Sequence, residues 1–428
     1  MRVLIAGSGA REHALAWACT RQSSNVELIC APGNGGTAIM PMAANVPVAA
    51  DDGAGIVAAA REFEANLVVV GPDAALAAGV ADACTAAGIP VFGPAASAAR
   101  IESSKVFAKT VMDEANIATA RWLSGKVTDR RRLLNLVAEL GGRCVVKADG
   151  LALGKGVFVC DDVDEAEAAI AACFDEQRFG AAGNEVLVEE RLEGLEVSVL
   201  ALTDSRNIRV LPAARDYKRI DDGDAGPNTG GMGALTPPAG IDPQFLELVE
   251  AQVLRPCVDT LRELGSPFSG CLYAGLMITA DGLRVLEFNA RFGDPETQVI
   301  VPVLTDDLLT LMADCAAGTL SPGYGVAASP SSAVGVVLAA AGYPGAPRKG
   351  DAITGLDQLD PSVIAFHAGT RRDADDTLRT DGGRVLTLVA RGDSPDEARQ
   401  QVYGALPGIH FEGMKYRGDI GLEQAGDI

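Results

Sequence analysis

The first hundred residues alternate short apolar runs with longer Ala-rich stretches of helical spacing. The runs predict buried strands at 2–6, 26–30, 67–70 and 89–92, and the stretches predict helices at 11–21, 54–65 and 74–87. Strands that alternate with helices in this way favour a doubly wound parallel sheet. Glycine-containing turns follow the strands, at the sheet edge where open α/β folds bind ligands.

Two short β-branched runs, 144–146 and 157–160, flank a segment rich in glycine and lysine. Its residues of interest are Gly150, Gly154, Gly156, Lys147 and Lys155. The glycines allow backbone amides to approach an anion, and the lysines add positive charge. The spacing excludes a P-loop, because one spacer residue is missing and a strand follows instead of a helix. The segment is either a phosphate-binding hairpin loop or a mobile turn with two solvated lysines.

A second hairpin is predicted from 272 to 290, with a type I′ turn at Ala280-Asp281-Gly282. Strict alternation places Val285, Glu287, Asn289 and Arg291 on one face of its second strand, and Leu286, Phe288 and Ala290 on the other. A carboxylate and an amide oxygen on one face suit Mg²⁺, and the arginine can clamp a carboxylate or phosphate. Asp294 and Glu296 extend this candidate site. A salt-bridged, solvent-exposed face is the alternative.

Two further glycine-rich turns leave alternatives open. Gly7-Ser8-Gly9 lacks the third small residue of a dinucleotide fingerprint, because Glu12 stands there. That turn binds a small phosphate at the start of a helix, with help from Arg11, or serves packing alone. The segment 226–234 holds four glycines and is either a linker or a close wrap around a ligand.

The last hundred residues predict strands near 333–340, 363–367 and 384–389. A helix is predicted from 395 to 406, with Ser394 as N-cap and Glu397 completing a capping box. No independent chemistry is evident there, so we expect this part to pack beside the N-terminal domain and close the cleft.

Charge and cysteine content narrow the class of protein. The net charge of −21 argues against a nucleic-acid or acidic-membrane partner, although it leaves small anionic substrates open. Nine cysteines without a C-x-x-C motif fit buried, reduced thiols in a cytoplasmic protein. The chain shows no signal-peptide pattern and no uncharged apolar run long enough to cross a membrane.

Taken together, the motifs resemble the ATP-grasp superfamily, and within it the phosphoribosylamine–glycine ligase family. The resemblance runs end to end, through G-S-G-A-R-E-H-A-L-A-W, A-P-G-N-G-G-T-A, V-G-P-D, K-A-D-G-L-A-L-G-K-G, G-P-N-T-G-G-M-G-A, E-F-N-A-R-F-G-D-P-E-T-Q, F-H-A-G-T and Y-R-G-D-I-G. Two departures concern loop conformation only: Ser103 stands where glycine is expected, and Ser8-Gly9-Ala10 replaces Asn-Gly-Gly.

The resemblance implies a multidomain α/β fold with three parts. These are an N-terminal substrate domain (1–104) with a doubly wound parallel sheet, an ATP-grasp domain (105–330) with a small lid subdomain at about 122–192, and a mixed α/β C-terminal domain (331–428). It also implies that ATP, glycine and 5-phosphoribosylamine give glycinamide ribonucleotide, ADP and phosphate through glycyl phosphate, within purine biosynthesis. A monomer is expected.

By the same resemblance, site residues carry over position by position. ATP would contact Lys105, Lys147, Gly150, Gly154, Lys155, Gly156, Glu189, Glu190, Leu192 and Glu196, and Mg²⁺ or Mn²⁺ would be held by Glu287 and Asn289. Glycine would be held by Arg291 and Asp216, which with Lys155 are the candidate catalytic residues. Phosphoribosylamine would contact Gly9, Arg11, Asn34, Asp73, Asn228, Thr229 and Gly230.

Two rival functions stay open on the sequence. One is another ATP-grasp carboxylate–amine ligase with a different acceptor. The other is a non-catalytic nucleotide-binding sensor that keeps the fold without turnover. The face formed by Glu287, Asn289 and Arg291 argues against the sensor, which needs no groups for both a metal and an acceptor.

Overall fold

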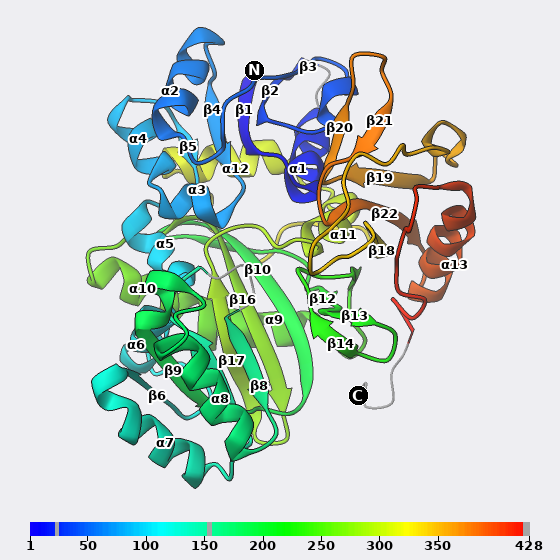
Figure 1. The fold of residues 1–428 in the computed structure, drawn as a ribbon. Coiled ribbons are helices and arrows are strands. Elements are labelled where there is room, and N and C mark those ends of the chain that lie inside the picture. The colour runs from blue at the N-terminus through cyan, green and yellow to red at the C-terminus, as the bar shows by residue number, and fades with distance from the viewer. Residues whose placement is uncertain (22–24, 152–155, 423–428) are drawn as a thin grey trace.

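A computed structural model describes residues 1–21, 25–151 and 156–422. The N-terminal part, the lid with the central sheet, and the C-terminal part surround a common centre (Figure 1). Within the described ranges, no helix is long and apolar enough to cross a membrane. The architecture is the mixed α/β, multidomain fold that the sequence predicts.

The N-terminal sheet is parallel, with strand order β3-β2-β1-β4-β5. Its strands are β1 (Arg2–Gly7), β2 (Glu27–Pro32), β3 (Ala43–Asn45), β4 (Leu67–Val70) and β5 (Val91–Phe92). Alternate residues of β1 enter different cores: Leu4 packs with α2 (Gly53–Glu62), and Val3 packs with α1 (Ala10–Arg21). Because helices cover both faces, the predicted doubly wound sheet is confirmed.

The helix predicted over 74–87 is in fact two helices, α3 (Asp73–Ala77) and α4 (Val80–Ala86). Gly79 separates them with a φ of +81°, a left-handed conformation that glycine adopts without steric cost. The chain then continues through α5 (Ala96–Ser103) and α6 (Lys105–Glu114) toward the lid.

The lid is a four-stranded antiparallel sheet of order β6-β9-β7-β8. Its elements are β6 (Trp122–Lys126), η2 (Val127–Asp129), α7 (Arg130–Glu139), β7 (Cys144–Ala148), β8 (Val157–Cys160), α8 (Val163–Phe174), η3 (Gly180–Asn184) and β9 (Glu185–Glu190). One face of the sheet packs on α7 and α8 in a separate apolar core. The opposite face of the lid sheet takes no part in this core and is turned toward the central sheet.

The central sheet is antiparallel, with order β11-β10-β16-β17. Its strands are β10 (Leu195–Asp204), β11 (Ile208–Val210), β16 (Ser269–Thr279) and β17 (Gly282–Asn289), and the helices near it are α9 (Pro243–Val249), η4 (Glu250–Leu254), α10 (Arg255–Glu263), α11 (Glu296–Val303) and α12 (Leu308–Ala317). Side chains of α11 and α12 also join the apolar core of α1 and β1, so the central part and the N-terminal part share one core.

A β-bulge in β17 corrects the predicted alternation of side chains. Gly275 pairs with Glu287, but the next residue, Leu276, pairs with Val285, so Leu286 is an extra residue in the strand. Val285 therefore lies in the core beside Phe288, not on the face of Glu287. The side chains of Glu287, Asn289 and Arg291 still share a face, as predicted.

The turn of this hairpin also differs from the prediction. Gly282 pairs with Thr279, so the loop is Ala280-Asp281. Neither loop residue has a positive φ, whereas Gly282 has a φ of +105°. A type I′ turn needs positive φ at both central residues, so the type I′ assignment was wrong.

The C-terminal sheet has order β12-β15-β18-β22-β19, and two of its strands come from the middle of the chain. The strands are β12 (Arg215–Asp216), β15 (Gly233–Thr236), β18 (Ser332–Ala339), β19 (Val363–His367) and β22 (Arg384–Gly392). Two hairpins, β13 (Arg219–Asp221) with β14 (Ala225–Asn228) and β20 (Thr370–Arg372) with β21 (Leu378–Thr380), stand beside it, as do η5 (Leu356–Gln358) and η6 (Leu406–Gly408). The short helix η1 (Thr37–Ile39) lies instead beside β3 of the N-terminal sheet. The sheet thus combines strands from both sides of the predicted domain boundary at residue 330. The predicted domain limits remain predictions.

The helix α13 (Pro395–Ala405) covers this sheet and begins at the predicted N-cap. Ser394 Oγ accepts from the amide of Glu397 at 3.2 Å. The carboxylate of Glu397 accepts from the amide of Asp393, not from that of Ser394. Only half of the predicted capping box is therefore formed.

The bulge predicts unequal costs for two neighbouring truncations. We expect Val285→Ala to lower the free energy of unfolding by about 2 kcal/mol or more, because it leaves a cavity in a fully buried core. Leu286→Ala, at the partly exposed bulge residue, should cost under about 1 kcal/mol. Urea denaturation of both variants measures the difference, and equal costs would contradict the bulged register.

Candidate active site

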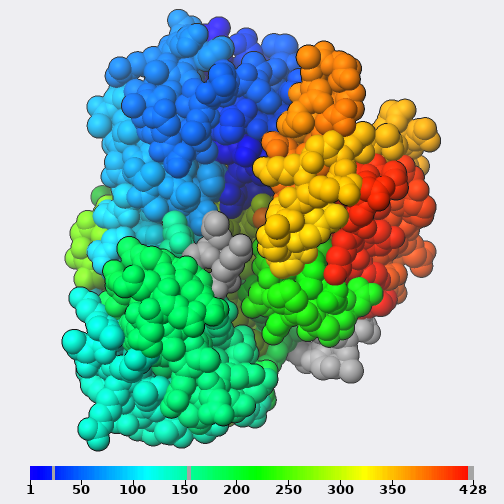
Figure 2. Space-filling model, viewed as in Figure 1, coloured from blue at the N-terminus to red at the C-terminus, as the bar shows by residue number. Residues whose placement is uncertain are grey.

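A cavity of about 390 Å³ lies where the three parts of the chain meet. Figure 2 shows a hollow between the blue N-terminal part, the green lid and the yellow-to-orange C-terminal part. The wall combines residues of the lid, the central strand β17, the turn after β4 and the segment 216–230. A site at this place matches the prediction that ligands bind beyond the strand ends of the N-terminal sheet.

Most of the predicted site residues lie in the wall of this cavity. They are Arg11, Asp73, Lys105, Lys147, Gly150, Gly156, Asp216, Thr229, Gly230, Glu287, Asn289 and Arg291. Residues more than 200 positions apart in sequence are thus brought to one place, although the roles assigned to them remain predictions.

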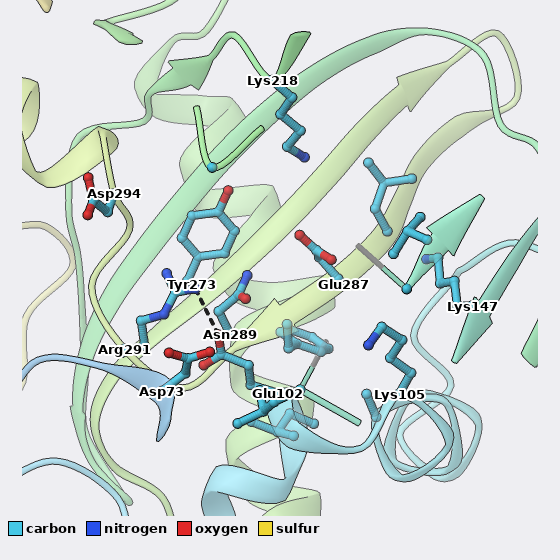
Figure 3. A pocket seen from close by; sticks show the side chains of 18 of the residues that line it. Asp73, Glu102, Lys105, Lys147, Lys218, Tyr273, Glu287, Asn289, Arg291 and Asp294 are labelled. Carbon is cyan, nitrogen blue, oxygen red and sulfur yellow. Dashed lines mark ion pairs between the residues drawn. The ribbon is translucent and has the colours of Figure 1, made fainter. Parts of the chain in front are cut away.

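Glu287 lies at the centre of a group of lysines. Lys105, Lys147 and Lys218 reach toward its carboxylate from different elements (Figure 3). Burial alone raises the pKa of Glu287, but nearby positive charges, led by Lys218, hold that pKa below its ordinary value. The carboxylate therefore stays ionised and available as a cation ligand.

The amide of Asn289 is the second candidate metal ligand on the same strand face. No group of three or more His, Cys, Asp or Glu side chains suited to a metal occurs in the described ranges. A hard cation here would therefore rely on few protein oxygens and complete its shell with water or substrate oxygens, which is typical of Mg²⁺.

Arg291 is braced from the N-terminal part. Glu102, at the end of α5, places Oε1 2.8 Å from Arg291 Nη2 and accepts from the amide of Ala290 through Oε2, also at 2.8 Å. The Nε atom of Arg291 is buried and has no hydrogen-bond partner among the residues that the structure describes. Since a buried unpaired donor is costly, this N–H is a candidate to donate to a ligand.

Asp216 offers a hydrogen-bond acceptor, which complements the donor on Arg291. Its Oδ1 atom is buried, and no hydrogen-bond partner for it occurs within the described ranges. Burial raises the pKa of Asp216 well above its ordinary value, and the neighbouring Lys218 only partly opposes this. Lys218 itself forms an ion pair with Glu196. Among the described residues of the cavity wall, one buried acceptor, on Asp216, and one buried donor, on Arg291, are thus unpaired.

The two strands that were predicted on either side of the hairpin loop are present as β7 and β8. Lys105 Nζ donates to the carbonyl of Gly150 at 2.9 Å, and the amide of Ala148 donates to the carbonyl of Gly156 at the same distance. Burial lowers the pKa of Lys105, against the opposing effect of Glu287. The predicted ATP residues Gly154 and Lys155 lie outside the described residues.

Other predicted residues lie away from the cavity wall: Gly9, Asn34, Glu189, Glu190, Leu192, Glu196 and Asn228. Glu189, which is 3% exposed, lies inside the lid between two lysines. Its Oε2 is 2.7 Å from Lys109 Nζ, and its Oε1 pairs with Lys147. This carboxylate positions a lysine of the cavity wall. Because side chains alternate along β9, Glu189 and Glu190 point to opposite faces of the lid sheet, so Glu189 is buried whereas Glu190 is exposed.

Asn34 holds the junction between the N-terminal and C-terminal parts. Its side-chain amide donates to the carbonyls of Ser8 and His367, at 2.9 and 2.8 Å. Its Oδ1 accepts from the amides of Gly36 and Thr37. The side chain is therefore fully engaged within the protein. Gly9 is close to the site nonetheless, since a Cβ there would lie 3.5 Å from Asp294 Oδ2.

Several wall residues received no role from the sequence: Glu102, Lys109, Lys218, Tyr273 and Arg384. Lys218 follows Asp216 by two positions, so strand alternation was a usable signal for it. The hydroxyl of Tyr273 is 2.8 Å from Glu296 Oε1 and 2.7 Å from Ser198 Oγ, and these three side chains form a buried network. Nothing local in the sequence points to Arg384, which comes from the C-terminal sheet.

Comparison with known proteins first identifies the class. The model of the ATP-grasp (A) domain of phosphoribosylglycinamide synthetase matches residues 103–297. The biotin carboxylase domain of Hydrogenobacter thermophilus 2-oxoglutarate carboxylase shares the fold, with a TM-score of 0.73 at 17% identity, covering 97% of this chain and 91% of the other. The central part is thus an ATP-grasp domain.

The flanking parts narrow the class to one family. Models of the N and C domains of phosphoribosylglycinamide synthetase match residues 1–102 and 333–423. The phosphoribosylamine–glycine ligase of Streptomyces coelicolor is 48% identical over the whole of both chains, and that of a Nostoc species is 45% identical, covering 98% of this chain and 99% of its own. The crystal structure of the Thermotoga maritima ligase covers 98% of this chain and all of its own, with a TM-score of 0.84 at 35% identity. The chain belongs to the phosphoribosylamine–glycine ligase family.

The buried position of Glu189 predicts a structural role that its neighbour lacks. We expect Glu189→Gln to lower the free energy of unfolding by about 3 kcal/mol, because it leaves two buried lysines without their shared carboxylate. Glu190→Gln, at an exposed position, is the matched control and should change stability little.

The pH dependence of the free energy of unfolding supplies a second test of the ion pairs that Glu189 forms with Lys109 and Lys147. Burial raises the pKa of Glu189, but Lys147 and Lys109 outweigh it and hold that pKa below its ordinary value. Such a carboxylate stabilises the fold above its unfolded-state pKa, and the contribution is lost as pH falls through the folded-state pKa. Denaturation of Glu189→Gln from neutral to acidic pH should therefore show a smaller loss of stability than the wild type. An unchanged acid loss would argue against the ion pairs.

Proposed function

We propose that the cavity joins glycine to 5-phosphoribosylamine at the expense of ATP, giving glycinamide ribonucleotide, ADP and phosphate. The family relationship supports this reaction, since the relatives that match the whole chain carry that ligase name. The observation that carries the proposal is the pair of unpaired buried atoms, Asp216 Oδ1 and Arg291 Nε, in a cavity lined by lysines.

These two atoms match the two ends of an amino acid. The Asp216 carboxylate suits an ammonium group, and the Arg291 N–H suits a carboxylate oxygen. Glycine would thus satisfy one buried acceptor and one buried donor at once. Arg291 stays protonated throughout, because Glu102 and other carboxylates outweigh burial and raise its pKa above its ordinary value.

Phosphates of ATP would occupy the lysine-rich side of the cavity. Lys105 and Lys147 supply positive charge there, and the backbone near Gly150 and Gly156 allows close approach. Lys155 and Gly154 belong to the same proposal. The backbone from Glu190 to Leu192 stays our proposal for the adenine edge, with Glu196 for ribose, whereas Glu189 positions Lys147.

The oxygens of Glu287 and Asn289 fit a divalent cation, because both are hard ligands on one strand face beside the lysines. When bound, the cation would neutralise phosphate charge that develops on the transferred group and on ADP. Mg²⁺ is our proposal for its identity, with Mn²⁺ as the substitute.

The reaction needs positioning more than an enzyme nucleophile. A glycine carboxylate oxygen attacks the γ-phosphorus, and the bond to the bridging oxygen of ADP breaks. The amine nitrogen of phosphoribosylamine then attacks the acyl carbon, phosphate leaves, and the nitrogen loses a proton. Arg291 holds the carboxylate, and the lysines stabilise the transferred charge.

The acceptor would enter from the N-terminal side. Arg11, Asp73, Thr229 and Gly230 line that end of the cavity, near Gly9. We further propose a cytoplasmic monomer that acts on small molecules without a nucleic-acid or membrane partner. The net charge of −21 supports the lack of a nucleic-acid or acidic-membrane partner, because such partners favour basic surfaces.

ADP release by the purified protein tests the proposed reaction. We expect release to require glycine, and glycinamide ribonucleotide to form only when phosphoribosylamine is also present. Omission of each substrate in turn is the control. ADP release that ignores both omissions would contradict the assignment.

The cation site makes its own prediction. Glu287→Gln should raise the Mg²⁺ or Mn²⁺ concentration needed for half-maximal ADP release about tenfold or more, because a charged ligand becomes a neutral one. Asp281→Asn, in the exposed turn of the same hairpin, is the control. A cation titration of Glu287→Gln that overlays the wild-type curve would remove Glu287 from the site.

A further inference from the structure

Arg384 is the point at which the C-terminal sheet reaches the cavity. It is the first residue of β22, and it lies in the cavity wall. Its Nη1 donates to the carbonyls of Gly230 and Asp294, the latter at 2.8 Å, and its Nη2 lies 3.1 Å from Asp294 Oδ2. One guanidinium therefore joins two loops that belong to different segments of the chain.

The first of these loops, residues 229–231, is held on both sides of Gly230. Arg384 binds its carbonyl, and the hydroxyl of Tyr343 accepts from its amide at 2.9 Å. Thr229 in turn donates from its amide and its hydroxyl to the carbonyl of Lys218, at 2.7 and 2.9 Å. Arg384 and Tyr343 of the C-terminal part, together with the carbonyl of Lys218, thus set the backbone position of this turn.

The second loop, at Asp294 and Pro295, fits closely against the first. Gly231 has a φ of +107°, and a Cβ there would lie 2.4 Å from Pro295 Cδ. The carboxylate of Asp294 also accepts from Gln298 Nε2 at 2.7 Å. Burial raises the pKa of Asp294, but Arg384 and then Arg11 outweigh it and lower that pKa below its ordinary value.

We infer that Arg384 is a positioning residue through which the C-terminal part fixes the acceptor end of the cavity. Its contacts hold Gly230 and Asp294 in the places that let the acceptor amine meet the activated glycine. The guanidinium acts through these two loops, without touching the reacting atoms. This inference rests on the proposed function.

Only arginine suits this position. Two carbonyls and a carboxylate need several N–H donors in a fixed plane, and a guanidinium supplies five. A lysine supplies a compact charge on a flexible stem, so it can pair with Asp294 without holding both carbonyls. Arg384→Lys therefore separates the geometry of the guanidinium from its charge.

The test uses Arg384→Met and Arg384→Lys, with Arg391→Met as the matched control. Arg391 lies on the same strand and also crosses to the central part, donating to the carbonyl of Pro302 at 3.2 Å, but it is not in the cavity wall. Tyr343→Phe, which removes the acceptor for the Gly230 amide, is a milder second variant. Steady-state kinetics, the ratio of ADP to glycinamide ribonucleotide, and Tm are measured for each.

We expect both Arg384 variants to raise the KM for phosphoribosylamine roughly 10- to 100-fold, since displaced loops no longer hold the acceptor in place. The ratio of ADP to product should rise above that of the wild type, because water then consumes the acyl phosphate. The KM for ATP, the glycine-dependent release of ADP and the Tm should stay close to those of Arg391→Met. Tyr343→Phe should shift the acceptor KM and the ratio in the same direction by less.

Three outcomes would overturn the inference. Arg384→Met or Arg384→Lys could keep the wild-type acceptor KM and product ratio, or Arg391→Met could show the same defect. The third is a parallel rise of all three KM values with a fall in Tm, which would indicate general loosening. Failure of the proposed function itself would instead appear in the wild-type protein, as ADP release independent of glycine and phosphoribosylamine.

Discussion

The need to compensate buried charge governs the construction of the cavity. Removing an ion from water is expensive, so a buried cation persists only beside an anion with suitable geometry. The cavity meets this need with pairs that join separate segments: Arg291 with Glu102, Lys147 with Glu189, Lys218 with Glu196, and Arg384 with Asp294. Each pair fixes a side chain of the cavity wall, and the pairs Arg291–Glu102 and Arg384–Asp294 also tie two parts of the chain together.

Lys105 and Glu287 lack a close partner of opposite sign among the described residues. Lys105 contacts the carbonyl of Gly150 but has no carboxylate within ion-pair distance among the described residues, and the same part of the chain offers Glu287 no cation at that range. A polyphosphate with its cation supplies both missing charges at once. The incomplete pairing therefore agrees with the ATP-grasp class that the fold defines.

Much of the fold was predictable, because it follows from local patterns. The parallel sheet came from βαβ alternation, and the hairpins came from short β-branched runs bounded by glycine and aspartate. The bulge at Leu286 was not predictable, since one extra residue leaves the composition of a strand unchanged and shows only in pairing with β16. Gly79 divided a predicted helix because its left-handed φ outweighed the continuous alanine pattern.

The residues of the candidate site also differ in whether a local sequence pattern or only the tertiary fold reveals them. Glu287, Asn289 and Arg291 were found because they share one strand face, and period-two spacing is a local property. The burial of Glu189 against Lys109 could not be predicted from the sequence, because it depends on packing inside the lid. Arg384 carried no signal, because its partners Gly230 and Asp294 lie more than 80 positions away and meet it only through the tertiary fold.

The composition of the C-terminal sheet has a consequence for the order in which the enzyme is made. Strand β15 pairs with β18 from Gly233 to Val336, and β18 pairs in turn with β22. During synthesis β15 leaves the ribosome after its partner β12 but long before its partner β18 exists, so the edge that pairs with β18 stays open until the last quarter of the chain emerges. The turn at Thr229 and Gly230, just before β15, therefore reaches its final place late. A nascent chain with a finished lid and central sheet would still lack the end of the cavity that we propose for the acceptor.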